Sequence, residues 1–315
     1  MPDYYALTRG VYGVPSAMEI MSSATSNVMI VVPVVRSVPT ADEQISWQHL
    51  LTHLGRHPIC LLAAEQMDLR WFTGQREDAH ILRVPPADLA SRRSYSRLLM
   101  RDAFYRQFTA HECLLIYQLD CLVFRDELEA WCRRPYDYVG APWSRADGAG
   151  GFAWLTGNGG FSLRRVNAFL RVLTTRRHPR MQAELAAWAA WLDVALRLPL
   201  SARRRSLSAL ACDVRALPGR LTAVQEQVGR PLAWLPYGGV RVFQRAFKGN
   251  EDLFWALVAP LIDPAFRVAP ADEALAFAFE LEPRAAFERT GRRLPFGCHA
   301  WPRYDRAFWE PYLQR

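Results

Sequence analysis

Apolar runs alternate with polar segments along the chain in a pattern that is typical of an α/β protein. Continuous apolar runs at residues 27–34 (NVMIVVPV), 58–63 and 114–117 predict strands that are buried on both faces of a sheet. Helices are predicted over 41–54 and over 90–108, and in the second of these apolar residues recur at helical spacing. The order strand, helix, strand predicts a doubly wound, mostly parallel sheet that is flanked by helices.

Two polar residues, Gln118 and Asp120, interrupt the apolar run LLIYQLDCLVF. Asp120 lies at or just beyond the carboxyl end of the predicted strand 114–117, and open α/β sheets bind ligands at that edge. A carboxylate in this position either ligates a hard metal ion or caps a helix. The strand alone leaves both interpretations open.

A glycine-rich segment, GNGGFSLR, places Gly157, Gly159 and Gly160 around Asn158. Glycines at this density allow positive φ angles and let backbone N–H groups approach a ligand closely. Tight turns use the same residues. The segment therefore indicates either contact with an anion or a sugar, or a turn.

Several other polar residues are candidates for a site, each with a structural alternative. Glu251 and Asp252 precede the apolar run LFWALV, so they suit either the start of a helix or a catalytic role facing a ligand. His299, in the turn PFGCHAW, is either a structural histidine or a metal ligand. Tyr95 and Arg97, near the start of the predicted helix, either reach a bound phosphate or belong to a helix surface.

The composition narrows the classes of function. Of 315 residues 50% are hydrophobic, which suffices for a substantial core, and no apolar run approaches the ~20 residues that span a bilayer. We therefore expect a cytoplasmic protein without a transmembrane segment. The net charge of +8 rests on arginines that are spread along the chain, with Lys248 the only lysine, and this argues against a nucleic-acid partner. The six cysteines lack CxxC spacing, which predicts reduced thiols.

The chain is expected to form one main domain. Residues 1–26 are polar and aperiodic, so we expect an extended arm. Residues 27–315 are expected to form a single domain. An Arg- and Ala-rich stretch around 200–230, bounded by Pro199 and Pro231, is expected to be a helical insertion.

Taken in order, the motifs QLD, YDYVGAPW, GNGGFSLR, NED and PFGCHAW resemble the domain-of-unknown-function family 5672, which is similar to GT-A-fold glycosyltransferases. The resemblance covers roughly residues 27–305. It implies a GT-A-like fold and the transfer of a sugar, with inversion, from a nucleotide-diphosphate-sugar donor to a hydroxyl acceptor. A UDP-sugar is the favoured donor, and the acceptor would be a glycan, a lipid-linked glycan or a protein.

The same resemblance implies roles for individual residues. Asp120 and His299 would hold Mn²⁺ or Mg²⁺, with Gln118 standing where GT-A enzymes have the first Asp of an Asp-x-Asp motif. Asp252, with Glu251 beside it, would be the catalytic base. The donor and acceptor would be bound by Pro33, Tyr95, Arg97, Gln118, Trp143, Gly157, Asn158, Gly159 and Gly160. Two other functions stay open, namely a nucleotidyltransferase and a non-catalytic nucleotide- or glycan-binding protein.

Overall fold

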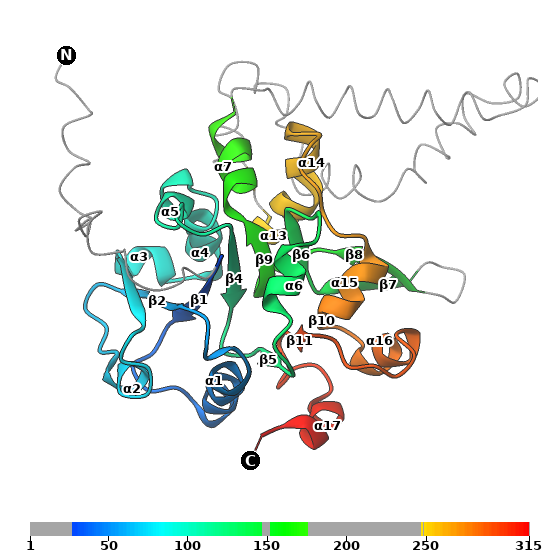
Figure 1. Ribbon diagram of the computed structural model, residues 1–315, viewed down its shortest axis with the longest axis horizontal. Coiled ribbons are helices and arrows are strands. Elements are labelled where there is room, and N and C mark those ends of the chain that lie inside the picture. The colour runs from blue at the N-terminus through cyan, green and yellow to red at the C-terminus, as the bar shows by residue number, and fades with distance from the viewer. Residues whose placement is uncertain (1–26, 147–151, 176–246, 248, 315) are drawn as a thin grey trace, which may run out of the picture.

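A six-stranded sheet in the order β3-β2-β1-β4-β9-β6 forms the centre of the molecule (Figure 1). Strands β1 to β4 are parallel, and β9 runs antiparallel to its neighbours β4 and β6. The predicted α/β fold with a mixed, mostly parallel sheet is confirmed. The strands are β1 (Val28–Val34), β2 (Ile59–Ala64), β3 (His80–Val84), β4 (Cys113–Tyr117), β6 (Tyr138–Gly140) and β9 (Phe161–Arg165).

The computed structural model describes most of the chain, namely residues 27–146, 152–175, 247 and 249–314. The predicted arm over 1–26 and the predicted insertion around 200–230 lie outside the described residues. Within them, no helix is long and apolar enough to cross a membrane. The five cysteines that the structure describes are buried and free, in agreement with the predicted reduced thiols.

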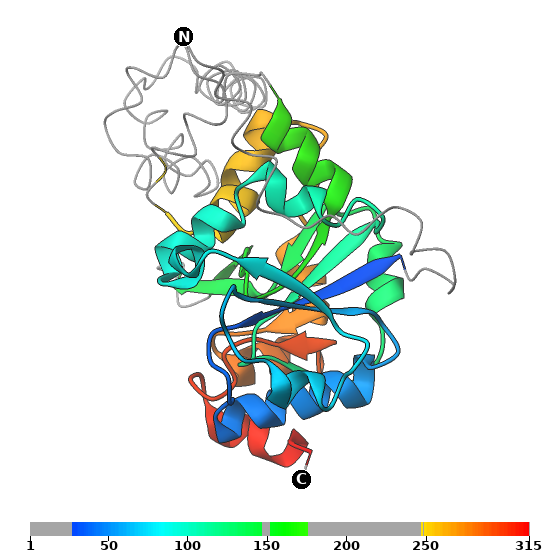
Figure 2. The ribbon, with the colours of Figure 1, turned by 90° about the vertical axis from the view of Figure 1, so that its left-hand side faces the viewer.

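The strand residues alternate between two hydrophobic cores, one on each face of the sheet. In β1, Val28, Ile30 and Val32 point into one core, while Met29 and Val31 point into the other. The first face is covered by α1 (Ala41–Leu54), α6 (Leu128–Cys132) and α15 (Ala271–Phe277). The second face is covered by α4 (Arg92–Leu98), α5 (Asp102–Arg106), α7 (Val166–Thr174) and α14 (Ala259–Ile262). Figure 2 shows α1, in blue, and α7, in green, on opposite sides of the sheet. Both faces of the central strands β1, β2 and β4 are therefore buried, which explains why the sequences of these strands are continuously apolar.

The helices agree with the prediction in one case and differ in another. Helix α1 spans the predicted residues, and the side chains of Thr40 and Glu43 form a capping box at its start. The prediction of a single helix over 90–108 is wrong, because this segment forms two helices, α4 and α5. The chain leaves the helix after α4, because the Leu99 carbonyl accepts a hydrogen bond from the Tyr105 hydroxyl (2.9 Å) and Arg101 is extended. The helices are α1 (Ala41–Leu54), α2 (Arg70–Thr73), α3 (Pro86–Leu89), α4 (Arg92–Leu98), α5 (Asp102–Arg106), α6 (Leu128–Cys132), α7 (Val166–Thr174), α13 (Glu251–Leu253), a π-helical turn (Phe254–Val258), α14 (Ala259–Ile262), α15 (Ala271–Phe277), α16 (Pro283–Arg289), α17 (Arg306–Trp309) and a 3-10 turn (Glu310–Tyr312).

Two smaller sheets complete the fold. One is a hairpin of β7 (Pro142–Ala146) and β8 (Phe152–Thr156). The other has the order β10-β11-β5, with β10 parallel to β11 and β11 antiparallel to β5. Its strands are β5 (Leu122–Val123), β10 (Ala278–Phe279) and β11 (Gly297–Cys298). This three-stranded sheet joins the segment that follows β4 to the C-terminal part of the chain, which positions the site described next.

Candidate active site

The carboxyl end of β4 and the amino end of β9 meet at one edge of the main sheet. Tyr117 is paired with Phe161, since the two strands are antiparallel. Directly beyond this pair, the Gln118 N–H donates to the Gly160 carbonyl at 3.0 Å. The motif QLD and the glycine-rich segment therefore lie side by side. No helix starts at Asp120, because the chain continues into β5, so the helix-capping interpretation of Asp120 is wrong.

His299 reaches the same place from the three-stranded sheet. It follows β11, and its backbone N–H donates to the Phe279 carbonyl at 2.9 Å. Its Nε2 lies 3.2 Å from Gln118 Oε1 and 3.4 Å from Asp120 Oδ1. Burial favours the neutral imidazole, but the charges of Asp120 and Glu280 outweigh burial and raise the pKa of His299.

Glu280 is a buried residue of this site that the sequence analysis missed. It follows β10 and is 7% exposed. Its Oε1 lies 2.8 Å from His299 Nδ1 and accepts a hydrogen bond from Asn158 Nδ2 at 2.9 Å. The only signal in the sequence is a carboxylate directly after an apolar run, the same signal that marks Asp120.

The glycine-rich segment forms a turn and also lines the site. Asn158 Oδ1 accepts hydrogen bonds from the N–H groups of Gly160 (2.8 Å) and Phe161 (3.3 Å). A Cβ at Gly160 would overlap the His299 imidazole. At Gly157 a Cβ would overlap the Trp143 ring. The glycines are therefore needed for close packing around the site, and Asn158 ties their turn to Glu280.

Behind the glycine turn lies a buried ion pair between Arg164 and Glu251. The exposed fractions of the two side chains are 0% and 5%, and the two guanidinium nitrogens lie 2.8 and 3.0 Å from the two carboxylate oxygens. Arg164 also donates to the Gly159 carbonyl at 3.1 Å and to the Tyr105 hydroxyl at 3.1 Å. Both oxygens of Glu251 are occupied, whereas a base needs an oxygen that faces the substrate.

Asp252 also lines the cavity but is not part of this ion pair. Asp252 and Glu251 form the first turn of α13, where the helix dipole favours carboxylates. One Asp252 oxygen accepts a hydrogen bond from the Leu253 N–H at 2.8 Å. Burial and the charge of Glu251 raise the pKa of Asp252 to about 7. A carboxylate with a pKa near neutrality is suited to exchange protons with a ligand.

These residues enclose a cavity of about 420 Å³. The predicted residues that line it are Tyr95, Gln118, Asp120, Trp143, Asn158, Gly159, Gly160, Glu251, Asp252 and His299. Pro33 lines an adjoining cavity of about 320 Å³ that shares Tyr95, Gln118 and Asp120. Arg97 is exposed and lines neither cavity. Three further lining residues were not predicted from the sequence. Arg92, one helical turn before Tyr95, lines both cavities, whereas Arg303 and Tyr304 line the 420 Å³ cavity.

The donor atoms at the end of β4 suit a hard divalent cation. Asp120 Oδ1 is buried and accepts no hydrogen bond from the described residues. The His299 Nε2 and Gln118 Oε1 atoms lie beside it, and imidazole nitrogen with carboxylate and amide oxygens is a donor set for Mn²⁺ or Mg²⁺. Cys121 is close enough to join them, but burial raises the pKa of its thiol far above the usual value. Asp120, His299 and Gln118 therefore fit the predicted metal, without the thiol.

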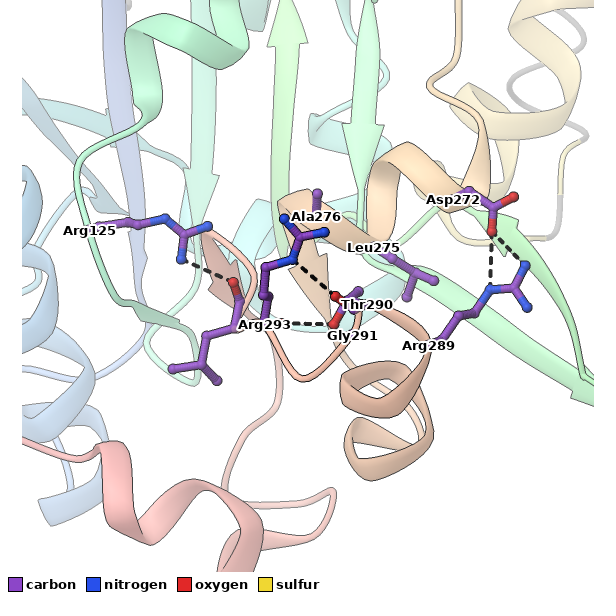
Figure 3. A pocket seen from close by; sticks show the side chains of 9 residues that line it. Arg125, Asp272, Leu275, Ala276, Arg289, Thr290, Gly291 and Arg293 are labelled. Atoms are coloured by element: carbon purple, nitrogen blue, oxygen red, sulfur yellow. Dashed lines mark hydrogen bonds and ion pairs between the residues drawn. The ribbon is translucent and has the colours of Figure 1, made fainter.

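A second cavity, of about 700 Å³, lies at the other end of the three-stranded sheet (Figure 3). Some of its lining residues directly precede β10 (Asp272, Leu275 and Ala276), and others precede β11 (residues 289–291, 293 and 294). Glu280 and His299, in contrast, directly follow β10 and β11. Arg289 contacts Asp272 at 2.6 Å, and Arg125 donates to the carbonyl of Leu294 at 3.0 Å. The guanidinium groups in this cavity thus already have protein partners, and we do not assign it a ligand.

Comparison with known families identifies a match over residues 78–299 to the protein family of unknown function DUF5672. The chain belongs to this family. The match includes Asp120, the glycine-rich segment, Asp252 and His299. No curated protein matches the sequence.

Solved structures with a related arrangement of elements include three glycosyltransferases. The galactosyltransferase LgtC shares 12% identity over 86% of each chain, with a TM-score of 0.41. The glycosyltransferase GlyE of Streptococcus pneumoniae shares 10% identity over 91% of this chain and 60% of its own, with a TM-score of 0.41. Mouse xyloside xylosyltransferase 1 shares 9% identity over 87% of this chain and 96% of its own, with a TM-score of 0.39. Similarities this distant do not identify a reaction, which has to be inferred from the site residues.

Proposed function

We propose that the protein is a glycosyltransferase that moves a sugar from a nucleotide-diphosphate-sugar donor to a hydroxyl acceptor with inversion. The observation that carries this proposal is that Asp252 lines the same cavity as Asp120 and His299. A glycosyl transfer needs a base for the acceptor hydroxyl and a cationic or hydrogen-bonding group for the leaving diphosphate. The cavity offers a candidate for each role.

Asp252 is the proposed base. With a pKa of about 7, its carboxylate takes up the proton of the acceptor hydroxyl as that oxygen attacks the anomeric carbon. The Leu253 N–H holds one carboxylate oxygen, which leaves the other for the acceptor. Glu251 has a different proposed role: its ion pair with Arg164 holds the first turn of α13 against the glycine segment, and its negative charge raises the pKa of Asp252.

Asp120, His299 and Gln118 are the proposed ligands of Mn²⁺ or Mg²⁺. When bound there, the cation would neutralise negative charge that develops on the departing diphosphate. Glu280 holds the Nδ1 side of His299, so that Nε2 is directed at Asp120 and Gln118. Arg92, which lines both cavities, is proposed to contact the same diphosphate.

The adjoining cavity is the proposed site of the nucleoside. Its walls include the apolar residues Pro33, Val35 and Leu89, and Val35 is 56% exposed. A base that packs on these side chains would remove them from water, which favours binding. We favour UDP-sugars as donors, and a glycan, lipid-linked glycan or protein as acceptor.

The first experiment is a thermal-shift panel of UDP, GDP, CDP and their common sugar conjugates, each with Mn²⁺, Mg²⁺ or EDTA. A ligand that binds only the folded state raises the melting temperature by an amount that grows with the logarithm of its concentration relative to its Kd. We expect a shift that requires one nucleotide together with a metal. When an acceptor hydroxyl is then supplied with the sugar conjugate, we expect the free nucleoside diphosphate to be released from that conjugate. Binding without any turnover would favour a non-catalytic binding protein. The absence of binding by every nucleotide would contradict the proposed function.

A further inference from the structure

The Glu280 carboxylate has one oxygen that is hydrogen-bonded and a second oxygen for which the described residues offer no hydrogen-bond donor. Oε1 lies between His299 Nδ1 and Asn158 Nδ2, at 2.8 and 2.9 Å. Oε2 is buried and accepts no hydrogen bond from the described residues. Leaving a buried charged oxygen unpaired is costly, so such an atom indicates a missing hydrogen-bond donor.

The position of Glu280 indicates which part of a ligand would supply that donor. Glu280 contacts the Nδ1 side of the His299 ring, whereas Gln118 and Asp120 lie by Nε2. Glu280 is therefore separated from the proposed metal and diphosphate by the width of an imidazole. Glu280, Asp120 and Asp252 line the same cavity. A sugar held between the proposed diphosphate site and the proposed base would therefore be within reach of Glu280.

We propose that Glu280 is a specificity residue that recognises the sugar, with Oε2 accepting a hydrogen bond from a hydroxyl or amino group of the transferred sugar. The inference rests on the proposed function, since it requires a sugar nucleotide in this cavity. Asn158 and His299 fix the carboxylate through Oε1, so Oε2 is held in one orientation before a ligand binds. A preorganised acceptor of this kind distinguishes a sugar that bears the donor group from one that lacks it.

The test compares binding of a nucleotide with binding of its sugar conjugate, by calorimetry, in wild type and in Glu280→Gln. The probes are UDP, UDP-glucose, UDP-galactose and UDP-N-acetylglucosamine, with GDP and GDP-mannose as the second set, all in Mn²⁺. In the variant we expect the affinity for the preferred sugar nucleotide to fall about 10- to 100-fold, the usual effect of losing a hydrogen bond to a charged group. At saturating Mn²⁺, the affinity for the nucleoside diphosphate alone should change less than about threefold, because the glutamine keeps an amide oxygen for His299 Nδ1 and lies away from the diphosphate.

Glu282→Gln is the matched control, since it makes the same change in charge two residues along the chain at an exposed position. It should leave both affinities unchanged. If Glu280→Gln does not fold, Glu280→Asp replaces it, because that variant keeps the charge and withdraws the carboxylate by one methylene. The preferred sugar nucleotide is then compared with its deoxy analogues, and one missing hydroxyl should weaken binding to wild type but not to the Glu280 variant.

The possible failures are distinct. Equal losses for the nucleotide and for its sugar conjugate would mean that Glu280 acts only through His299, and this would overturn the proposed recognition of the sugar while leaving the proposed function intact. Unchanged binding of both would overturn it as well. If neither the nucleotides nor their conjugates bind wild type, the proposed function itself fails.

Discussion

The two cavities at opposite ends of the three-stranded sheet differ in the state of their polar groups. In the larger cavity, Arg125 and Arg289 are bonded to carbonyls or carboxylates of the protein. In the 420 Å³ cavity, Asp120 and Glu280 each have a buried oxygen that accepts no hydrogen bond from the described residues. The pKa of Asp252, which lines the same cavity, is raised to about 7. Unsatisfied and perturbed groups, rather than volume, therefore indicate which cavity is prepared for a ligand.

The largest effect is expected at Asp252. Asp252→Asn removes the proposed base but keeps the shape of the side chain, so transfer should slow by about 10²- to 10⁴-fold. Nucleotide affinity should stay within about twofold, because the diphosphate is bound by other groups. Product formation and calorimetry measure the two quantities. Retention of full turnover would remove Asp252 from the mechanism.

The pH dependence follows from the same residue. The base must be deprotonated, so the rate of transfer should rise with pH and level off above about 7. For stability the sign is opposite. Between the usual pKa of 3.8 and about 7 the folded chain holds a proton that the unfolded chain has lost, so stability falls as pH rises through this window. Asp252→Asn should abolish this contribution and raise the melting temperature relative to wild type more at pH 8 than at pH 4.

Breaking the ion pair behind the glycine turn should chiefly affect stability. Glu251→Gln leaves the fully buried Arg164 without its charged partner, which should lower the free energy of unfolding by about 3 kcal/mol. Denaturant titration gives this value. Glu288→Gln is the control, because its partner Arg292 is exposed and such pairs contribute at most about 1 kcal/mol. Equal losses in both variants would contradict a structural role for Glu251.

Metal binding should distinguish the two cavities. Asp120→Asn removes the carboxylate of the proposed metal site. Loss of an outer-sphere partner already lowers metal affinity about 10- to 100-fold, so loss of this direct ligand should lower Mn²⁺ affinity by at least as much. Asp272→Asn makes the same change in charge in the larger cavity and should leave Mn²⁺ affinity unchanged. Electron paramagnetic resonance of free Mn²⁺ measures both. Equal Mn²⁺ binding by wild type and Asp120→Asn would exclude the proposed site.

The smallest effects are expected from a pair of arginine variants. Arg92→Gln, at a position that lines both cavities of the proposed donor site, should weaken nucleoside diphosphate binding about tenfold. Arg293→Gln, in the separate cavity of Figure 3, should leave binding unchanged and stability within about 0.5 kcal/mol. A loss of nucleotide binding in Arg293→Gln alone would reverse the assignment of the two cavities.

Local sequence determined the elements whose residues interact mainly with near neighbours. Helix α1 was predicted to the residue, and the strands β1, β2 and β4 were predicted to within one or two residues. Their signals are an apolar run or helical periodicity, and both can be read from the sequence of the segment itself. The break between α4 and α5 was missed, because the contacts made there join residues that are apart in the chain: the Tyr105 hydroxyl donates to the Leu99 carbonyl, and Arg101 donates to Asp88 at 2.7 Å.

The site shows the same division. Asp120, Asp252 and His299 were identified by residue type and motif order, but only the tertiary structure decided how they combine. The pairing of β4 with β9 and of β10 with β11 brings residues 118, 160, 280 and 299 together, and no local pattern encodes that proximity. The sequence alone also did not separate Glu251 from Asp252. They are adjacent in the chain and both line the cavity, yet the ion pair with Arg164 occupies both oxygens of Glu251, while Asp252 lies outside that ion pair.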